Sequence, residues 1–136
     1  MKNLIISRVD SLRLRDRINF HLKNRGESVR EVTALKEELG KAEVVEPEQI
    51  PPDVVTMRTT VKLRHPETGK SLEIQLVYPE EADFKQGKIS IFAPVASALL
   101  GNRKGDTVCW PAPGGMTRMI IEDILYQPEA SGDLSL

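Results

Sequence analysis

Apolar residues in the first third of the chain recur at helical intervals. Leu14, Ile18 and Leu22 are four residues apart, which places them on one face of a helix. Ser7 and Asp10 precede them with the spacing of a capping box, a pattern typical of a helix start. The sequence therefore predicts a first helix that begins near Ser7.

A second helix is predicted after Gly26, a residue type that can take the left-handed conformation at a helix end. Ser28 and Glu31 have capping-box spacing. Apolar residues then repeat at alternating intervals of three and four, as in a coiled-coil seam: Val32, Leu35, Leu39 and Ala42. Helices joined by so short a turn are antiparallel neighbours. We expect residues 1–46 to form an antiparallel helical hairpin, a short coiled coil.

The period changes from helical to alternating after a proline-rich linker, residues 47–52, because Pro51 and Pro52 cannot continue a helix. Turn signals occur at His65–Lys70 and Pro113–Gly115. Strand signals lie at Val54–Leu63, Leu72–Leu76, Ile89–Ile91, Val108–Trp110 and Met119–Tyr126. A short helix is predicted from Pro94 to Gly101. Residues 53–128 thus indicate an antiparallel sheet of about five strands with one inserted helix, an α+β domain, followed by a tail of residues 129–136.

Composition excludes several classes of protein. The 136 residues carry a formal net charge of -1, so no overall basic excess points to nucleic acid. The single cysteine, Cys109, excludes an internal disulfide framework and a cysteine-based zinc site, and we expect its side chain to be buried. His21 and His65 have no carboxylate or cysteine spacing that indicates a metal site. The single cysteine suits a reducing compartment, and no apolar run has membrane-spanning length, so we expect a cytoplasmic protein with no membrane contact. We also expect a monomer.

The C-terminal half resembles a known family. The residues that carry the resemblance keep its order and spacing: Glu81–Gln86, Ile89–Ser90, Pro94, Ala98–Gly101, Gly105–Asp106 and Pro113–Gly115. They are similar to the C-terminal domain of the Gre-type transcript cleavage factors, over roughly Val54 to Tyr126. In that family the domain has an FKBP-like fold and docks on the rim of the secondary channel of bacterial RNA polymerase. Pro52–Met57 and Tyr126–Ala130 resemble a branch of the family with a short hairpin.

The resemblance implies RNA polymerase as the partner and the loop Phe92, Ala93 and Pro94 as its contact. Cleavage factors typically have Ser-Pro here, and only Pro94 matches that pattern. They also carry an Asp-x-x-Glu pair, which delivers Mg²⁺ for RNA cleavage, at the tip of a longer coiled coil. The segment Lys23–Glu31 has no such pair.

The predicted tip contains Arg25, Glu27 and Glu31, and Glu31 is better explained as the capping partner of Ser28. Each helix of the hairpin would span about 25 Å, short of the reach of the full-length factors. We therefore expect no catalytic residue, metal or cofactor. The predicted function is a non-catalytic regulator that competes with Gre factors for the polymerase rim.

Two enzymatic alternatives are weaker, namely a residual cleavage factor and an FKBP-like prolyl isomerase. A prolyl isomerase needs an aromatic-lined pocket, and aromatic residues are only 4% of the chain. The first helix is also basic, and we expect Arg13, Arg15 and Arg17 to form one face of it. That face is either solvated or contacts acidic protein or nucleic acid phosphate.

Overall fold

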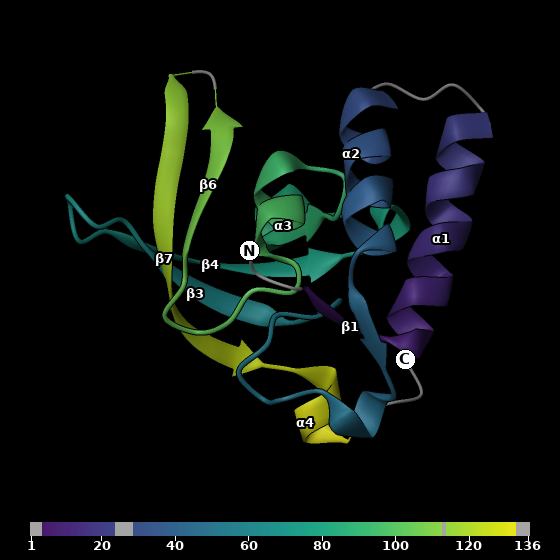
Figure 1. Ribbon diagram of the computed structural model, residues 1–136. Coiled ribbons are helices and arrows are strands. Elements are labelled where there is room, and N and C mark those ends of the chain that lie inside the picture. The colour runs from purple at the N-terminus through teal and green to yellow at the C-terminus, as the bar shows by residue number, and fades with distance from the viewer. Residues whose placement is uncertain (1–3, 24–28, 113, 133–136) are drawn as a thin grey trace.

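The computed structural model describes residues 4–23, 29–112 and 114–132 and has a helical hairpin beside a five-stranded sheet (Figure 1). The helices are α1 (Arg8–Lys23), α2 (Val29–Gly40), α3 (Pro94–Leu99) and α4 (Pro128–Ser131). The strands are β1 (Ile5–Ser7), β2 (Glu43–Val45), β3 (Thr60–Arg64), β4 (Ser71–Val77), β5 (Lys88–Ser90), β6 (Thr107–Ala112) and β7 (Gly115–Tyr126). The mixed α+β class predicted from the sequence is confirmed.

The hairpin consists of α1 and α2, which lie side by side (Figure 1). Leu14 and Ile18 of α1 are buried, as are Val32 and Leu35 of α2. The predicted extent of the second helix is wrong, because α2 ends at Gly40. The chain then forms β2, which pairs in parallel with β1 just before α1. Three-residue strands are too short to show a periodic signal, so the sequence did not predict this pair.

The main sheet has the strand order β5-β4-β3-β7-β6. The hairpins β3–β4 and β6–β7 are antiparallel, as predicted. The prediction of a wholly antiparallel sheet is wrong, because β5 runs parallel to β4. Two single 3-10 turns, Pro79–Glu81 and Phe84–Gln86, lie between these strands. These turns reverse the chain after β4 and bring it back beside Gln75, so that β5 runs in the same direction as β4.

One hydrophobic core joins the hairpin to the sheet. Buried residues of α1 and α2 belong to the same cluster as Leu63 of β3, Leu76 of β4 and Leu99 of α3. The first predicted strand, Val54–Leu63, begins too early, because β3 starts at Thr60. The segment Val54–Met57 is a buried loop. Because burial of apolar surface stabilises both parts together, the hairpin is held against the domain by packing as well as by polar contacts.

Helix α3 begins at Pro94, as predicted, but it ends at Leu99 and not at the predicted Gly101. Pro94 occupies its first turn, where a missing N–H is tolerated. Gly101, just beyond the helix, has φ +81°, and a Cβ there would lie 2.9 Å from the Cβ of Leu4. Glycine is therefore required at this position both by conformation and by the close approach of the N-terminal segment.

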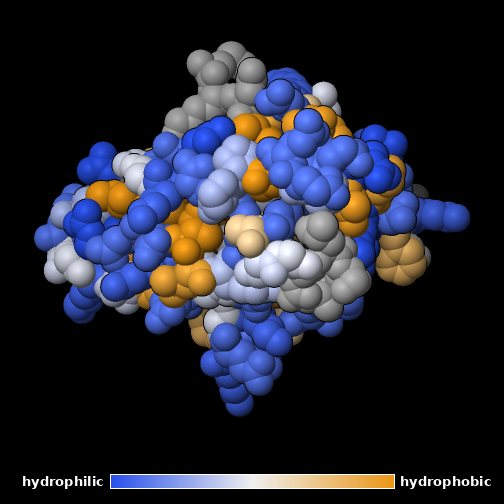
Figure 2. Space-filling view, turned by 90° about the horizontal axis from the view of Figure 1, so that it is seen from below, coloured by the Kyte–Doolittle hydropathy of each residue, from blue (hydrophilic) through white to orange (hydrophobic). Residues whose placement is uncertain are grey.

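The expected burial of Cys109 is wrong, because its side chain is exposed. Residues alternate between the two faces of a strand, and in β6 it is the neighbouring Val108 that is buried. The face of the molecule seen from below is mainly hydrophilic, with small separate hydrophobic areas (Figure 2). None of the described helices is long and apolar enough to cross a membrane.

Candidate functional site

The loop before α3 contains the residues expected to contact a partner. Pro94 is exposed, whereas Phe92 is half-buried and packs against the core. The Ser97 hydroxyl donates to the carbonyl oxygens of Ile91 and Ala93, each at 3.2 Å. The loop therefore has a defined conformation, and it presents Pro94 rather than Phe92 to solvent.

An apolar groove of about 280 Å³ lies beside Pro94. It joins three elements that are far apart in the sequence, because its walls come from α2, α3 and β6. The residues that line it include Leu35, Ala98, Leu100, Cys109, Trp110 and Pro111. An apolar groove next to an exposed, rigid loop is suited to receive an apolar side of another protein.

Arg13, Arg15 and Arg17 of α1 do not all share one face, contrary to the interpretation of the sequence. Arg17 forms an ion pair with Glu80, and Arg13 lines a small cavity with Tyr78. Arg15 instead lines a groove between α1 and α2. The reason is helical geometry: at 3.6 residues per turn, residues two apart lie about 160° from each other.

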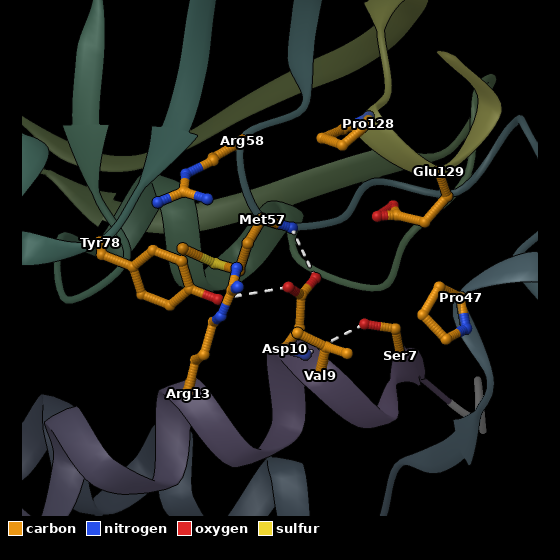
Figure 3. A pocket seen from close by; sticks show the side chains of 10 residues that line it. All are labelled: Ser7, Val9, Asp10, Arg13, Pro47, Met57, Arg58, Tyr78, Pro128 and Glu129. Atoms are coloured by element: carbon orange, nitrogen blue, oxygen red, sulfur yellow. Dashed lines mark hydrogen bonds between the residues drawn. The ribbon is translucent and has the colours of Figure 1, made fainter. Parts of the chain in front are cut away.

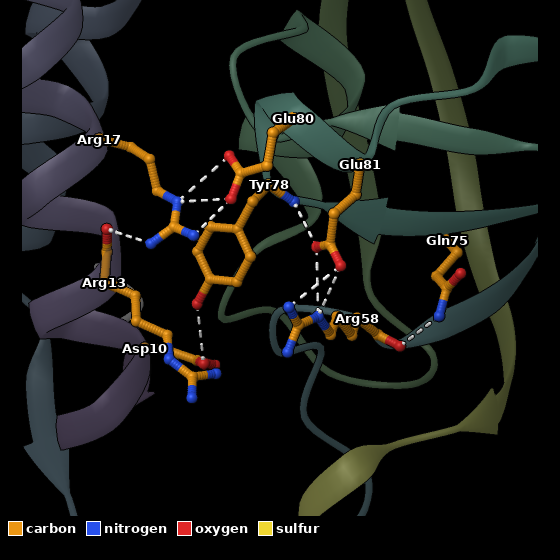
Figure 4. A network of polar contacts seen from close by, with 8 residues as sticks. All are labelled: Asp10, Arg13, Arg17, Arg58, Gln75, Tyr78, Glu80 and Glu81. Carbon is orange, nitrogen blue, oxygen red and sulfur yellow. Dashed lines mark hydrogen bonds and ion pairs between the residues drawn. The ribbon is translucent and has the colours of Figure 1, made fainter. Parts of the chain in front are cut away.

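Tyr78 is the centre of the contact between α1 and the sheet domain (Figure 4). Its side chain is fully buried. The guanidinium carbon of Arg17 lies 4.1 Å from the ring centroid, and that of Arg58 lies 5.3 Å away. Both distances are in the range of cation–π attraction. The tyrosine ring thus contacts one cation from the hairpin and one from the loop before β3.

Each of these arginines has a carboxylate partner from the same short turn after Tyr78. Glu80 pairs with Arg17, and Glu81 pairs with Arg58 at 3.0 Å. Glu81 also accepts a hydrogen bond from the backbone N–H of Tyr78 at 3.3 Å. The bond to Arg17 lowers the pKa of the Glu80 carboxyl below its usual value. The turn therefore orients both cations around the ring.

Asp10 lies beneath Tyr78 and is almost entirely buried (Figure 3). Its carboxylate accepts from the Tyr78 hydroxyl and from the Met57 N–H, each at 3.2 Å. Burial raises the pKa of the Asp10 carboxyl, although these two hydrogen bonds and nearby Arg13 partly oppose the shift. Burial is also the main cause of the raised pKa of the Tyr78 hydroxyl. The pair thus joins the start of α1 to the end of β4.

Glu129 of α4 is the second carboxyl at this junction (Figure 3). It accepts a hydrogen bond from the Thr56 hydroxyl. Burial raises its pKa, and the charge of Asp10 adds to the shift. The cavity between these groups is only about 30 Å³, far below the volume of a small-molecule site. We conclude that these residues position the hairpin rather than bind a ligand.

The remaining residues singled out from the sequence are those of the hairpin tip and the two histidines. Arg25 and Glu27 lie outside the described residues, as do the side chains of Glu31 and His21. His65 accepts hydrogen bonds at Nδ1 from the N–H groups of Glu67 and Thr68, as expected of a turn residue. Within the described part of the chain, no group of three or more His, Cys, Asp or Glu residues could hold a metal ion.

The junction around Tyr78 was missed by the sequence interpretation. Asp10 was interpreted as a helix-capping residue, and its backbone N–H does donate to the Ser7 hydroxyl at 3.0 Å. Its carboxylate, however, contacts groups 47 and 68 residues away in sequence. The one local signal was a tyrosine followed by Pro-Glu-Glu, directly after a strand.

Comparison with known proteins identifies the family. Residues 50–126 match the model of the C-terminal domain of the transcription elongation factors GreA and GreB. The chain belongs to the GreA/GreB family. The match spans the whole sheet domain, including α3 and the loop that precedes it.

Several relatives extend the GreA/GreB assignment. The regulator of nucleoside diphosphate kinase from Escherichia coli K12 is 43% identical over 104 residues, which are 76% of each chain. This regulator covers most of the chain, including residues outside the matched C-terminal domain. The transcription elongation factor GreA of Acidiphilium cryptum is 40% identical over 62% of this chain, but over only 54% of its own length.

Solved structures agree with the GreA/GreB assignment. A transcription elongation factor GreA/GreB from Nitrosomonas europaea is 42% identical, covers 91% of this chain and 100% of its own, and superposes with a TM-score of 0.78. The GreA factor homolog Gfh1 of Thermus thermophilus, at 20% identity and a TM-score of 0.50, shares the fold.

Proposed function

We propose that this protein is a transcription regulator that binds bacterial RNA polymerase as a monomer at the rim of the secondary channel. It would compete with Gre factors there without stimulating RNA cleavage. Support comes from family membership and from the resemblance of the sheet domain to the rim-docking, FKBP-like domain of the cleavage factors. We include in this proposal the division into a hairpin (1–46), a linker (47–52), a domain (53–128) and a tail (129–136).

The observation that carries the proposal is the exposure of Pro94 beside the apolar groove. Pro94 is the residue of the predicted contact loop that matches the family pattern, and it is the exposed one. Pro94 lies on a hydrogen-bonded turn next to Ala98 and Trp110 of the groove. Together these residues form a concave apolar surface against which a partner protein can pack. Phe92 contributes by packing inward and supporting the loop.

The non-catalytic part of the proposal rests on the hairpin. Helix α1 has 16 residues, or about 24 Å at 1.5 Å per residue. The sequence between Lys23 and Glu31 has no Asp-x-x-Glu pair, so two carboxylates are not spaced to hold a catalytic Mg²⁺. A protein of this kind occupies the channel entrance without performing chemistry.

The test is binding to core RNA polymerase by two matched variants. Pro94→Asp introduces a charge into the groove, yet aspartate suits the first turn of a helix, so the fold is retained. Ala130→Asp adds the same charge on α4, away from α3 (Figure 1). We expect about tenfold weaker binding for Pro94→Asp, or roughly 1.4 kcal/mol, and no change for Ala130→Asp. Equal affinity of both variants and the unmodified protein would exclude this loop as the contact.

A cleavage assay tests the mechanism. Added to a backtracked elongation complex, the protein should give no RNA cleavage of its own and should inhibit cleavage stimulated by a Gre factor. Inhibition should diminish as the Gre concentration rises. Inhibition that extra Gre factor cannot reverse would indicate a different site on the polymerase, and stimulated cleavage that Glu27→Gln abolishes would show that the tip is catalytic.

A further inference from the structure

The two helices of the hairpin enclose a groove separate from the Pro94 surface. Its volume is about 330 Å³, which is within the range of small-molecule sites. Helix α1 contributes one wall and α2 the other, and Gly40 at the end of α2 adds no side chain to it. The polar side chains that line it are Ser11, Arg15, Asn19 and Lys36.

The two cations that line this groove, Arg15 and Lys36, differ in their ion pairing from the two arginines that contact Tyr78. Arg17 is engaged by Glu80, and Arg58 by Glu81. Arg15 and Lys36 are exposed, and in the described part of the chain neither side chain forms an ion pair or hydrogen bond. Both therefore line the groove without an ion-pair partner among the carboxylates that the structure describes.

The chemistry of the lining is that of hydrogen-bond donors. All four polar side chains can donate, and guanidinium and ammonium groups can only donate. No carboxylate of the described residues lines the groove, although Asp16 and Glu37 are adjacent in sequence to the two cations. The floor is apolar, formed by Ile18 and Leu39. Such a site favours a ligand with several acceptor oxygens, at least two negative charges and an apolar body.

We infer that this groove binds the diphosphate or triphosphate group of a small molecule. One cation from each helix can contact one of two adjacent phosphate groups, because packed helices are about 8–10 Å apart and both side chains are long. Ser11 and Asn19 supply further donors from α1. Among the described residues, two cations line the groove. Two cations give weak attraction to a long nucleic acid, so the charge and the limited volume of the groove favour a small ligand.

The test uses the full chain and inorganic pyrophosphate as the probe, at fixed ionic strength, with backbone amide NMR shifts as the readout. Binding should shift the resonances of α1 and α2 around Ser11 and Lys36. Arg15→Gln with Lys36→Gln should weaken binding about tenfold or more. The matched control, Lys70→Gln with Lys85→Gln, removes the same charge from exposed sites on the sheet domain and should leave the affinity within about twofold.

Three results would overturn the inference. They are no shift at millimolar pyrophosphate, equal weakening in both double variants, and displacement of pyrophosphate by a short single-stranded RNA or a polyglutamate peptide that binds more tightly. A nucleoside triphosphate that binds more tightly than pyrophosphate would support a contribution from the apolar floor. The polymerase assays do not enter this test, so its failure leaves the proposed rim docking unaffected.

Discussion

The guanidinium of Arg17 lies over the ring of Tyr78, with 4.1 Å between the guanidinium carbon and the ring centroid. Arg17 belongs to the hairpin and Tyr78 to the end of β4, so this contact joins the two parts of the molecule (Figure 4). The guanidinium of Arg17 also donates hydrogen bonds to the carboxylate of Glu80. Cation–π attraction and the ion pair therefore act on the same side chain.

Arg17→Met should lower the free energy of unfolding by about 1–2 kcal/mol, because it removes both contacts while retaining an apolar stem. Arg15→Met on the same helix is the matched control and should change it by less than about 0.5 kcal/mol, since Arg15 forms no ion pair among the described residues. Urea unfolding of both variants measures the difference. Equal losses of stability in the two variants would show that the contacts of Arg17 with Tyr78 and Glu80 do not stabilise the fold.

Tyr78→Phe should destabilise the protein by about 1–2 kcal/mol, because the buried Asp10 carboxylate loses a hydrogen-bond donor. The ring and its contacts with Arg17 and Arg58 are kept, so the effect reports the hydroxyl alone. Urea unfolding with unchanged circular dichroism of the folded state is the measurement. A variant as stable as the unmodified protein would mean that Asp10 is protonated and needs no donor.

Asp10→Asn should change how stability depends on pH. Burial raises the pKa of Asp10 above its ordinary value of 3.8, so between these two values the folded state binds a proton that the unfolded state does not. The stabilisation from this group is complete below the ordinary value and is lost as pH rises through the raised pKa. Unfolding measured from about pH 7 towards about pH 4 should show the unmodified protein gaining stability relative to Asp10→Asn.

Other titrating groups do not reverse this expectation. Glu129 has a raised pKa and therefore the same sign, and its shift should shrink in Asp10→Asn because the charge of Asp10 contributes to it. Glu46 and Glu80 have lowered pKa values and the opposite sign, but they are present in both proteins and cancel in the comparison. A stability difference that is constant with pH would contradict the assigned burial of an ionisable Asp10.

Cys109 should react with a maleimide in the folded protein at close to one equivalent, because its side chain is exposed. It also lines the apolar groove with Pro94. If the rim of RNA polymerase occupies that groove, core polymerase should slow the alkylation. Mass spectrometry of the labelled chain measures both effects, and labelling at an unchanged rate with saturating polymerase would contradict docking at the groove.

Local patterns in the sequence predicted most of the elements. The helical spacing of Leu14 and Ile18, the turn at His65–Lys70 and the proline at the start of α3 each depend on neighbours within a few residues. Parallel pairing of β5 with β4 depends instead on the path of the intervening turns, which no periodicity encodes.

The sequence interpretation of the site was less complete. Arg15 and Arg17 were placed on one face, although a spacing of two is the period of a strand and not of a helix. Exposure of Cys109 follows from the same rule, once Val108 is known to face the core. The contact between Asp10 and Tyr78 joins residues 68 positions apart, and only the tertiary fold brings them together.

The parallel pair of β1 and β2 anchors the hairpin at both of its ends. The base of the hairpin is therefore fixed by two paired strands, which restrict its rotation relative to the sheet domain. With an arm of about 24 Å for the 16 residues of α1, a tilt of about 10° at the base displaces the far end of that helix by about 4 Å. A small change in the angle of α1 at Asp10 and Tyr78 therefore gives a larger displacement at Lys23. The contacts at the base of the hairpin determine the direction in which α1 points.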